Sequence, residues 1–133
     1  MTRHIICNQA RCKKCDTLII SHHDHDFKSC KCGSLSVDGG NSYTRRLFNN
    51  INDFEELTVY SEAPYEVIRQ NLHRGSMGKH GNGPLTWVKL SDIDDDYLTS
   101  LIDYVGKFTT RTWQYEYYIK EKEFRECNYE ISD

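Results

Sequence analysis

The stretch Arg11–Gly33, RCKKCDTLIISHHDHDFKSCKCG, decides how the first part of this 133-residue chain is interpreted. It contains two cysteine pairs, C-x2-C at Cys12 and Cys15 and C-x-C at Cys30 and Cys32, with histidines between them. Zinc binds four soft or borderline ligands in a tetrahedron, and two short cysteine loops joined by a β-hairpin supply that geometry. We therefore predict a structural Zn²⁺ held by all four cysteines.

Three other interpretations of the stretch are possible. A redox dithiol at Cys12 and Cys15 normally comes with a βαβ context, which is not predicted here. Disulfides are disfavoured because no secretory signal opens the chain. A catalytic zinc would use fewer cysteines and leave one position open, with His22, His23 or His25 as a ligand. These histidines fall at the expected hairpin tip or early in its second strand, so we favour a solvated turn, and replacement of one cysteine by a histidine stays open.

The remaining cysteines, Cys7 and Cys127, have no partner at metal-ligand spacing. We expect both to be ordinary small residues of the core or the surface. No apolar run reaches the roughly 18–20 residues that span a membrane, and no signal-peptide pattern is present. We therefore expect a cytoplasmic protein with no membrane partner, whose modest core relies on aromatic residues, given 38% hydrophobic content and a mean hydropathy of -0.72.

Charge is distributed unevenly although the net charge is only -3. Residues 1–50 carry eight Lys and Arg against four Asp and Glu, whereas residues 51–133 carry nine against sixteen. A basic first part suits an anionic partner, and the acidic remainder argues against a general nucleic-acid coat. Ordinary surface charge explains the same numbers equally well.

The pattern of strands first and helices later predicts an α+β fold. We expect a zinc-ribbon and β-hairpin region at residues 1–50, followed by a small mixed strand and helix region at residues 51–133 that packs with it as one unit. Gly39-Gly40-Asn41 is the expected hairpin turn, Ser91 or Asp94 the expected cap of the second helix, and Gly75 the end of the first. The expected strands are Thr17–Ser21, His25–Cys30, Leu35–Asp38, Tyr43–Leu47, Phe54–Ser61 and Leu85–Leu90. The expected helices are Tyr65–Arg74, Tyr97–Val105 and Arg111–Cys127. The first half of the last helix is also compatible with a strand.

Five motifs occur in a fixed order: CKKC, HDFKSCKCG, SVDGG, YTRR and PLTWVKLSDI. In this combination the chain resembles a family of uncharacterised zinc-ribbon proteins of tailed bacteriophages, over most of residues 10–105. The resemblance implies a phage origin, action in the infected host cell and an accessory role, but no activity. One departure is Asp16, where such cysteine turns commonly carry glycine, so the first turn is expected to be distorted.

Two segments outside the cysteine stretch contain candidate ligand-binding residues. The first is SVDGGNSYTRR, Ser36–Arg46, where a Gly-Gly turn stands beside Tyr43, Arg45 and Arg46. Backbone N–H groups and guanidinium groups that converge in this way can hold a phosphate. The alternatives are a plain hairpin turn with solvated arginines, or a general base or metal ligand at Asp38.

The second segment is HRGSMGKHGNGPL, His73–Leu85, which contains Arg74, Lys79 and His80. It is not a phosphate-binding loop of the G-x4-G-K-[ST] type, because His80 follows the lysine and because the loop leaves a helix and enters a strand. A loop that folds over an anion and a mobile connection without a ligand are both compatible with this composition.

From these features we expect a non-enzymatic phage accessory protein that binds an anionic ligand, although enzymatic activity is not excluded. The ligand would be nucleic acid or a nucleotide, including a host signalling nucleotide sequestered during infection. The predicted contacts are Tyr43, Arg45, Arg46, Arg74, Lys79 and His80. One alternative is a protein–protein inhibitor whose acidic face blocks a host enzyme or defence factor, and another is an enzyme acting on nucleic acid or nucleotides through His73, His80 or Asp38. The sequence does not indicate an oligomeric state.

Overall fold

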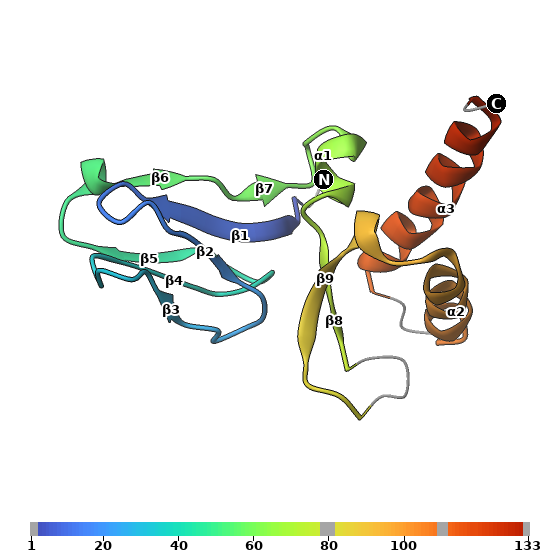
Figure 1. Ribbon diagram of the computed structural model, residues 1–133, viewed down its shortest axis with the longest axis horizontal. Helices are drawn as coiled ribbons and strands as arrows, with labels where there is room; N and C mark the ends of the chain where they lie inside the picture. The colour runs from blue at the N-terminus through green and yellow to red at the C-terminus, as the bar shows by residue number, and fades with distance from the viewer. Residues whose placement is uncertain (1–2, 78–81, 109–111, 132–133) are drawn as a thin grey trace. The chain divides into compact units, whose positions relative to one another are not determined.

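The computed structural model describes residues 3–77, 82–108 and 112–131, and the chain divides into two compact units, Met1–His73 and Arg74–Asp133. It is a mixed α+β protein with small antiparallel sheets in its N-terminal part and helices towards its C-terminus, as predicted (Figure 1). The first unit extends beyond residue 50 because later strands pair with its first strand. Within the described ranges, every helix is too short or too polar to cross a membrane.

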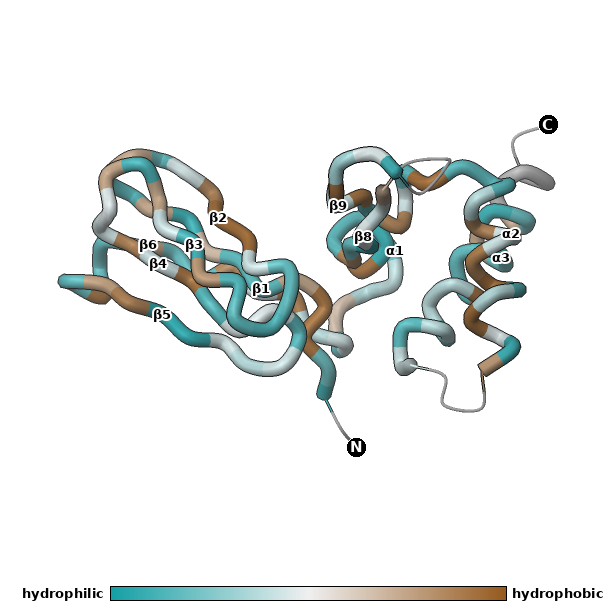
Figure 2. The backbone as a smooth tube through the Cα atoms, turned by 90° about the horizontal axis from the view of Figure 1, so that it is seen from below, coloured by the Kyte–Doolittle hydropathy of each residue, from teal (hydrophilic) through white to brown (hydrophobic). Residues whose placement is uncertain are grey.

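Strand β1, Ile5–Cys12, is the centre of the first unit. It pairs in antiparallel register with β2 (Leu18–Ser21) on one side and with β6 (Phe54–Glu56) and β7 (Val59–Tyr60) on the other. Nearly all its residues are buried, so side chains on both of its faces are covered. Figure 2 shows hydrophobic stretches along β1 and β2. The sequence predicted β2 but missed β1.

A second sheet of the first unit has the order β3-β4-β5, formed by Lys28–Ser29, Leu35–Asp38 and Arg45–Phe48. It packs against the sheet of β1, and the two layers are visible one above the other in Figure 1. The predicted hairpin across Gly39-Gly40 is confirmed, with Asp38 opposite Arg45. The core between the layers is formed by Ala10, Cys12, Ile19, Cys30, Leu35 and Val37.

The strands expected at residues 25–30 and 54–61 differ in extent from those observed. The strand expected from His25 begins only at β3, because His25 has a φ of 63° and the chain turns there instead of extending. The strand expected over residues 54–61 is divided into β6 and β7. A short 3-10 helix, η1 (Ile51–Asp53), precedes β6.

The first helix, α1, covers only Tyr65–Arg69. The prediction that it reaches Arg74 and ends at Gly75 is wrong, because β8 (His73–Ser76) begins there and Gly75 is part of that strand. The N–H groups of Asn71 and Leu72 both donate to the carbonyl of Ile68, which closes the end of the helical segment two residues before the strand.

The second unit contains a hairpin of β8 and β9 (Thr86–Lys89), followed by η2 (Leu90–Asp92) and two packed helices, α2 (Asp95–Gly106) and α3 (Gln114–Ile131). The predicted cap is confirmed, since the Asp94 carboxylate accepts the N–H of Tyr97 at 2.7 Å. The prediction of a helix over Arg111–Cys127 is also confirmed for the residues of that segment that belong to α3.

Arg125 of α3 connects the helices to η2. Its guanidinium donates to the carboxylate of Glu121 at 2.7 Å and to the carbonyls of Leu90 and Ile93 at 3.1 and 2.7 Å. Glu121 is 0% exposed, so its charge is compensated inside the unit. Glu121 and Arg125 therefore have a structural role, which is to hold α3 against η2.

The turn at Gly40 has no space for a side chain. Gly40 has a φ of 51°, and a Cβ there would lie 2.3 Å from the carbonyl carbon of His23. Gly33 has a φ of 76° but open space around it. Gly40→Ala should therefore lower the free energy of unfolding by about 3 kcal/mol or more, because strain and overpacking add, and Gly33→Ala by only about 1 kcal/mol. Urea denaturation of both variants measures the difference, and equal losses would contradict it.

Candidate metal centre and predicted ligand residues

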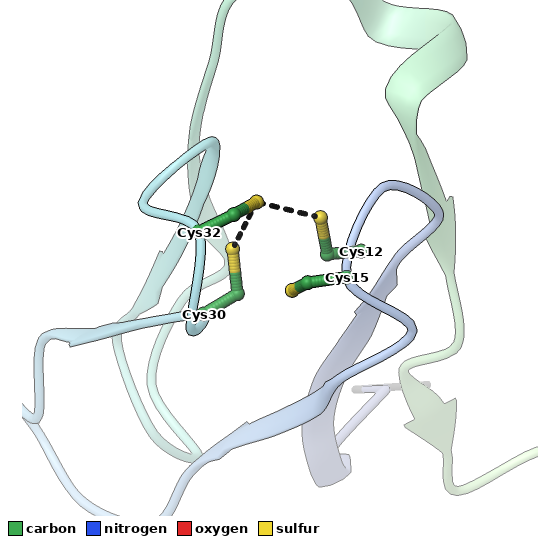
Figure 3. A group of neighbouring side chains, drawn as sticks. All are labelled: Cys12, Cys15, Cys30 and Cys32. Atoms are coloured by element: carbon green, nitrogen blue, oxygen red, sulfur yellow. Dashed lines mark hydrogen bonds between the residues drawn. The ribbon is translucent and has the colours of Figure 1, made fainter.

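Four cysteine thiols converge at one end of the first unit (Figure 3). The Sγ atoms of Cys12, Cys15, Cys30 and Cys32, here called the cysteine cluster, all lie within 4.8 Å of one another. The Sγ of Cys32 is 3.6 Å from those of both Cys12 and Cys30. Thiolates bound to one tetrahedral zinc are about 3.7 Å apart, whereas a disulfide requires about 2.05 Å. The cysteine cluster is therefore a possible metal site and contains no disulfide.

The two loops that present the thiols are closed in the same way. The N–H of Cys12 donates to the carbonyl of Thr17, and the N–H of Cys30 to that of Leu35, both at 2.9 Å. Each loop contains one residue in the left-handed conformation, Asp16 with a φ of 55° and Gly33 with a φ of 76°. Asp16 thus takes the conformation that glycine has in the second loop, which aspartate tolerates better than most residues. Its departure from glycine does not prevent the loop from closing.

Hydroxyl groups favour the thiolate form of the two outer cysteines. The Thr17 hydroxyl lies 3.1 Å from the Sγ of Cys15, and the Ser34 hydroxyl lies 3.3 Å from that of Cys32. Hydrogen bonding with the Thr17 side chain and with the backbone of Cys32 lowers the pKa of Cys15 to about 5, and hydrogen bonding with Ser34 lowers the pKa of Cys32. Thiolates are the form that binds metals.

The cysteine cluster joins the core to the surface. Cys12 and Cys30 are buried among the core residues, whereas Cys15 is partly exposed and Cys32 is exposed. Cys12 ends β1 of one sheet, and Cys30 lies between β3 and β4 of the other. A metal in the cluster would therefore cross-link the two layers of the first unit.

The histidines of the cysteine stretch lie in the turn after β2 and supply no donor to the cysteine cluster. His23 and His25 are exposed, as expected for a solvated turn. His22 is partly buried, its N–H donates to the Asp26 carboxylate at 2.8 Å, and its ring contacts that of His73. The possible metal site of the cysteine cluster is thus made of cysteines alone.

The Gly-Gly turn of the predicted phosphate site is occupied by internal hydrogen bonds. The N–H of Gly39 donates to the Asp38 carboxylate at 2.9 Å, and the N–H of Gly40 donates to the Ser21 hydroxyl at 3.0 Å. The side-chain amide of buried Asn8 donates to the carbonyls of Asp38, Gly40 and Tyr43 at 2.9–3.1 Å. These N–H groups stabilise the hairpin and are not directed at a ligand.

The adjacent arginines have different environments. Arg46 forms a forked ion pair with Glu56 at 2.7 and 2.8 Å and donates to Thr58 at 2.8 Å, and its side chain is 9% exposed. The side chain of Arg45 is 61% exposed, with its guanidinium 4.0 Å from Asp38. Tyr43 is exposed beside His25. Of this group, Arg46 is engaged within the fold, while Arg45 and Tyr43 remain accessible.

Arg74, the fourth predicted contact, belongs to the second unit. It is partly buried, and its Nη1 lies 3.5 Å from the Tyr118 hydroxyl. Its Nε is buried without a hydrogen-bond partner. The last two predicted contacts, Lys79 and His80, lie outside the described residues.

Residues 4–48 match a protein family described as a domain of unknown function (DUF7695). The matching segment contains β1 to β5, and with them the cysteine cluster and the Gly-Gly hairpin. No curated protein and no solved structure matches the chain. The similarity supports an uncharacterised domain in the first unit, and the phage origin stays a prediction.

Sequence reasoning missed the partners of Arg46, because Glu56 and Thr58 lie on the other layer. The prediction is that Arg46→Ala lowers the free energy of unfolding by about 2 kcal/mol, since the fork between the layers is lost and Glu56 is left without its cation. Arg45→Ala, the matched control with the same change in charge, should alter it by less than about 0.5 kcal/mol. Thermal and urea unfolding measure both values, and an equal effect of the two substitutions would refute the distinction.

Proposed function

We propose that this protein is a non-enzymatic binding protein in which a structural Zn²⁺ occupies the cysteine cluster and arginine side chains bind an anionic ligand, either a nucleotide or nucleic acid. The setting that fits the sequence resemblance is an accessory role of a phage protein in the infected cell. The observation that carries the ligand half of the proposal is the uncompensated guanidinium of Arg74. The convergence of four thiols supports the zinc half.

Zinc is the metal that fits the donor set best. Four sulfur donors at these separations suit a tetrahedral ion, and four protein ligands form a closed site with no position for a water or a substrate. Such a site contributes folding free energy and not chemistry. The closed donor set is therefore consistent with a structural role and with a non-enzymatic protein.

Arg74 has the properties of an anion-binding residue. Within the part of the chain that the structure describes, no carboxylate forms an ion pair with it. A partly buried guanidinium with an unsatisfied Nε is costly unless an anion accepts its hydrogen bonds. The planar fork of arginine suits phosphate in particular. Tyr118, whose ring centroid is 6.0 Å from the guanidinium carbon, limits the directions from which a ligand can approach.

On the first unit, Arg45 and Tyr43 offer a second, exposed pair of contacts. An arginine next to an aromatic ring can bind a phosphate and stack on a base. Because both side chains are exposed, each contact should contribute less than Arg74 does. Arg46, which the sequence placed in the same group, is assigned here to the stability of the fold.

The zinc half predicts that protein dialysed extensively against buffer without metal retains one Zn²⁺ per chain. Cys30→Ser should reduce the retained zinc to less than about a tenth and unfold the first unit, because three ligands cannot close the site around the ion. Cys127→Ser, which removes an exposed cysteine outside the cluster, should leave the zinc content unchanged. Elemental analysis and circular dichroism provide the readouts. Full zinc retention by Cys30→Ser would overturn this assignment.

The ligand half predicts that Arg74→Gln weakens binding of fluorescently labelled single-stranded DNA or labelled ribonucleotides by about 10- to 100-fold, since charge-assisted hydrogen bonds contribute roughly 1.5–3 kcal/mol. Lys107→Gln is the matched control, because it removes the same charge from an exposed position of the same unit. Arg45→Ala should have a smaller effect. Fluorescence anisotropy at fixed ionic strength measures all variants. Equal affinities of Arg74→Gln and Lys107→Gln, or no binding by the wild type, would refute the proposal.

A further inference from the structure

A second group of metal-binding side chains lies in the first unit, apart from the cysteine cluster. Cys7 comes from β1, His22 follows β2, and His73 is the first residue of β8. They surround a small cavity, which offers about 10 Å³ to the centre of a water-sized sphere. This is room for about one water molecule or one ion. The cavity is completed by Ile6, Ile20, Ser21 and Asn41.

The separations in this group are close to those of a zinc site. The Sγ of Cys7 is 4.0 Å from the Nδ1 of His73, and the ring centroids of His22 and His73 are 5.0 Å apart. On one tetrahedral zinc, a sulfur and a nitrogen donor are about 3.5 Å apart, and the centres of two imidazole rings about 5 Å. Both separations therefore lie within about half an ångström of what an ion requires.

The surroundings of His22 favour a neutral ring that can be oriented for a metal. Its pKa is lowered to about 4, mainly by burial and also by Lys28. The Nδ1 of His22 lies 3.0 Å from the Nζ of Lys28 and 3.9 Å from the Asp26 carboxylate. Metal-bound histidines commonly donate their second N–H to a carboxylate. In this structure Nδ1 accepts from the Lys28 ammonium, which also forms a 3.3 Å ion pair with Asp26. With Nε2 on an ion, Nδ1 would carry the proton, so the Lys28 ammonium would move away from it and Nδ1 would donate to Asp26.

We propose that Cys7, His22 and His73 form a second metal site that takes Zn²⁺ or a similar divalent ion, with a water as the fourth ligand. Among the described residues, only the cysteine cluster has three or more donors already within 4.8 Å of one another. The second site therefore closes as the ion enters, when the His22 ring rotates and Cys7 and His73 approach each other. It binds more weakly than the cysteine cluster and ties His73, the last residue of the first unit, to the central sheet.

The test uses the full chain without an affinity tag, since added histidines would bind metal themselves. Protein carrying one retained Zn²⁺ is titrated with Co²⁺ and followed by native mass spectrometry and visible absorption. The wild type should bind one Co²⁺ and show a thiolate-to-cobalt charge-transfer band. Cys7→Ser should lose that band, and both Cys7→Ser and His73→Gln should bind the second ion at least about tenfold more weakly. His23→Gln and Cys127→Ser, which change a histidine and a cysteine outside the cavity, should behave as the wild type does.

The inference is overturned if the wild type binds no second ion, if the charge-transfer band persists in Cys7→Ser, or if His73→Gln keeps the wild-type affinity. A variant is folded if it retains the first zinc and has the wild-type circular dichroism spectrum. If Cys7→Ser does not fold, the result for His73→Gln decides whether the second site exists. The result is distinguishable from a failure of the proposed function. Loss of the first ion follows Cys30→Ser, whereas loss of the second follows Cys7→Ser.

Discussion

The convergence of the four thiols of the cysteine cluster is the constraint on which the first unit depends. The strands of this unit are short, and β3 contains only 2 residues. Small units with little core commonly need a metal or a disulfide to become stable. Because Cys12 and Cys30 come from different layers and are both buried, a metal bound to them would join the layers where hydrophobic packing has few residues to use.

Polar contacts complement the cysteine cluster at the other end of β4 and at the edge of the layers. Asn8 fixes the Gly-Gly hairpin through three carbonyls, and Arg46 connects β5 to β6 through Glu56. Both are long-range contacts made by side chains that look like surface residues in the sequence. The segment Ser36–Arg46, which contained most of the predicted ligand contacts, is therefore largely structural, although Arg45 within it stays exposed.

Local rules predicted a part of this structure, and long-range packing determined the rest. The cysteine spacing, the Gly-Gly turn and the Asp94 cap each depend on a few neighbouring residues, so the sequence was sufficient to predict them. Strand β1 was missed because buried Asn8 and Gln9 interrupt its hydrophobic pattern, and their burial depends on partners 30 or more residues away. The pairing of Arg46 and the early end of α1 depend on contacts between layers or on the following strand. Cys7 has no ligand neighbour in sequence, and only the fold brings it to His73.

The unequal exposure of the four cysteines would give a metal in the cluster one path to and from solvent. An arriving ion would meet the exposed thiol of Cys32 and the partly exposed thiol of Cys15 first, and both of these thiols have a lowered pKa. It would lose its last waters only on reaching the buried Cys12 and Cys30.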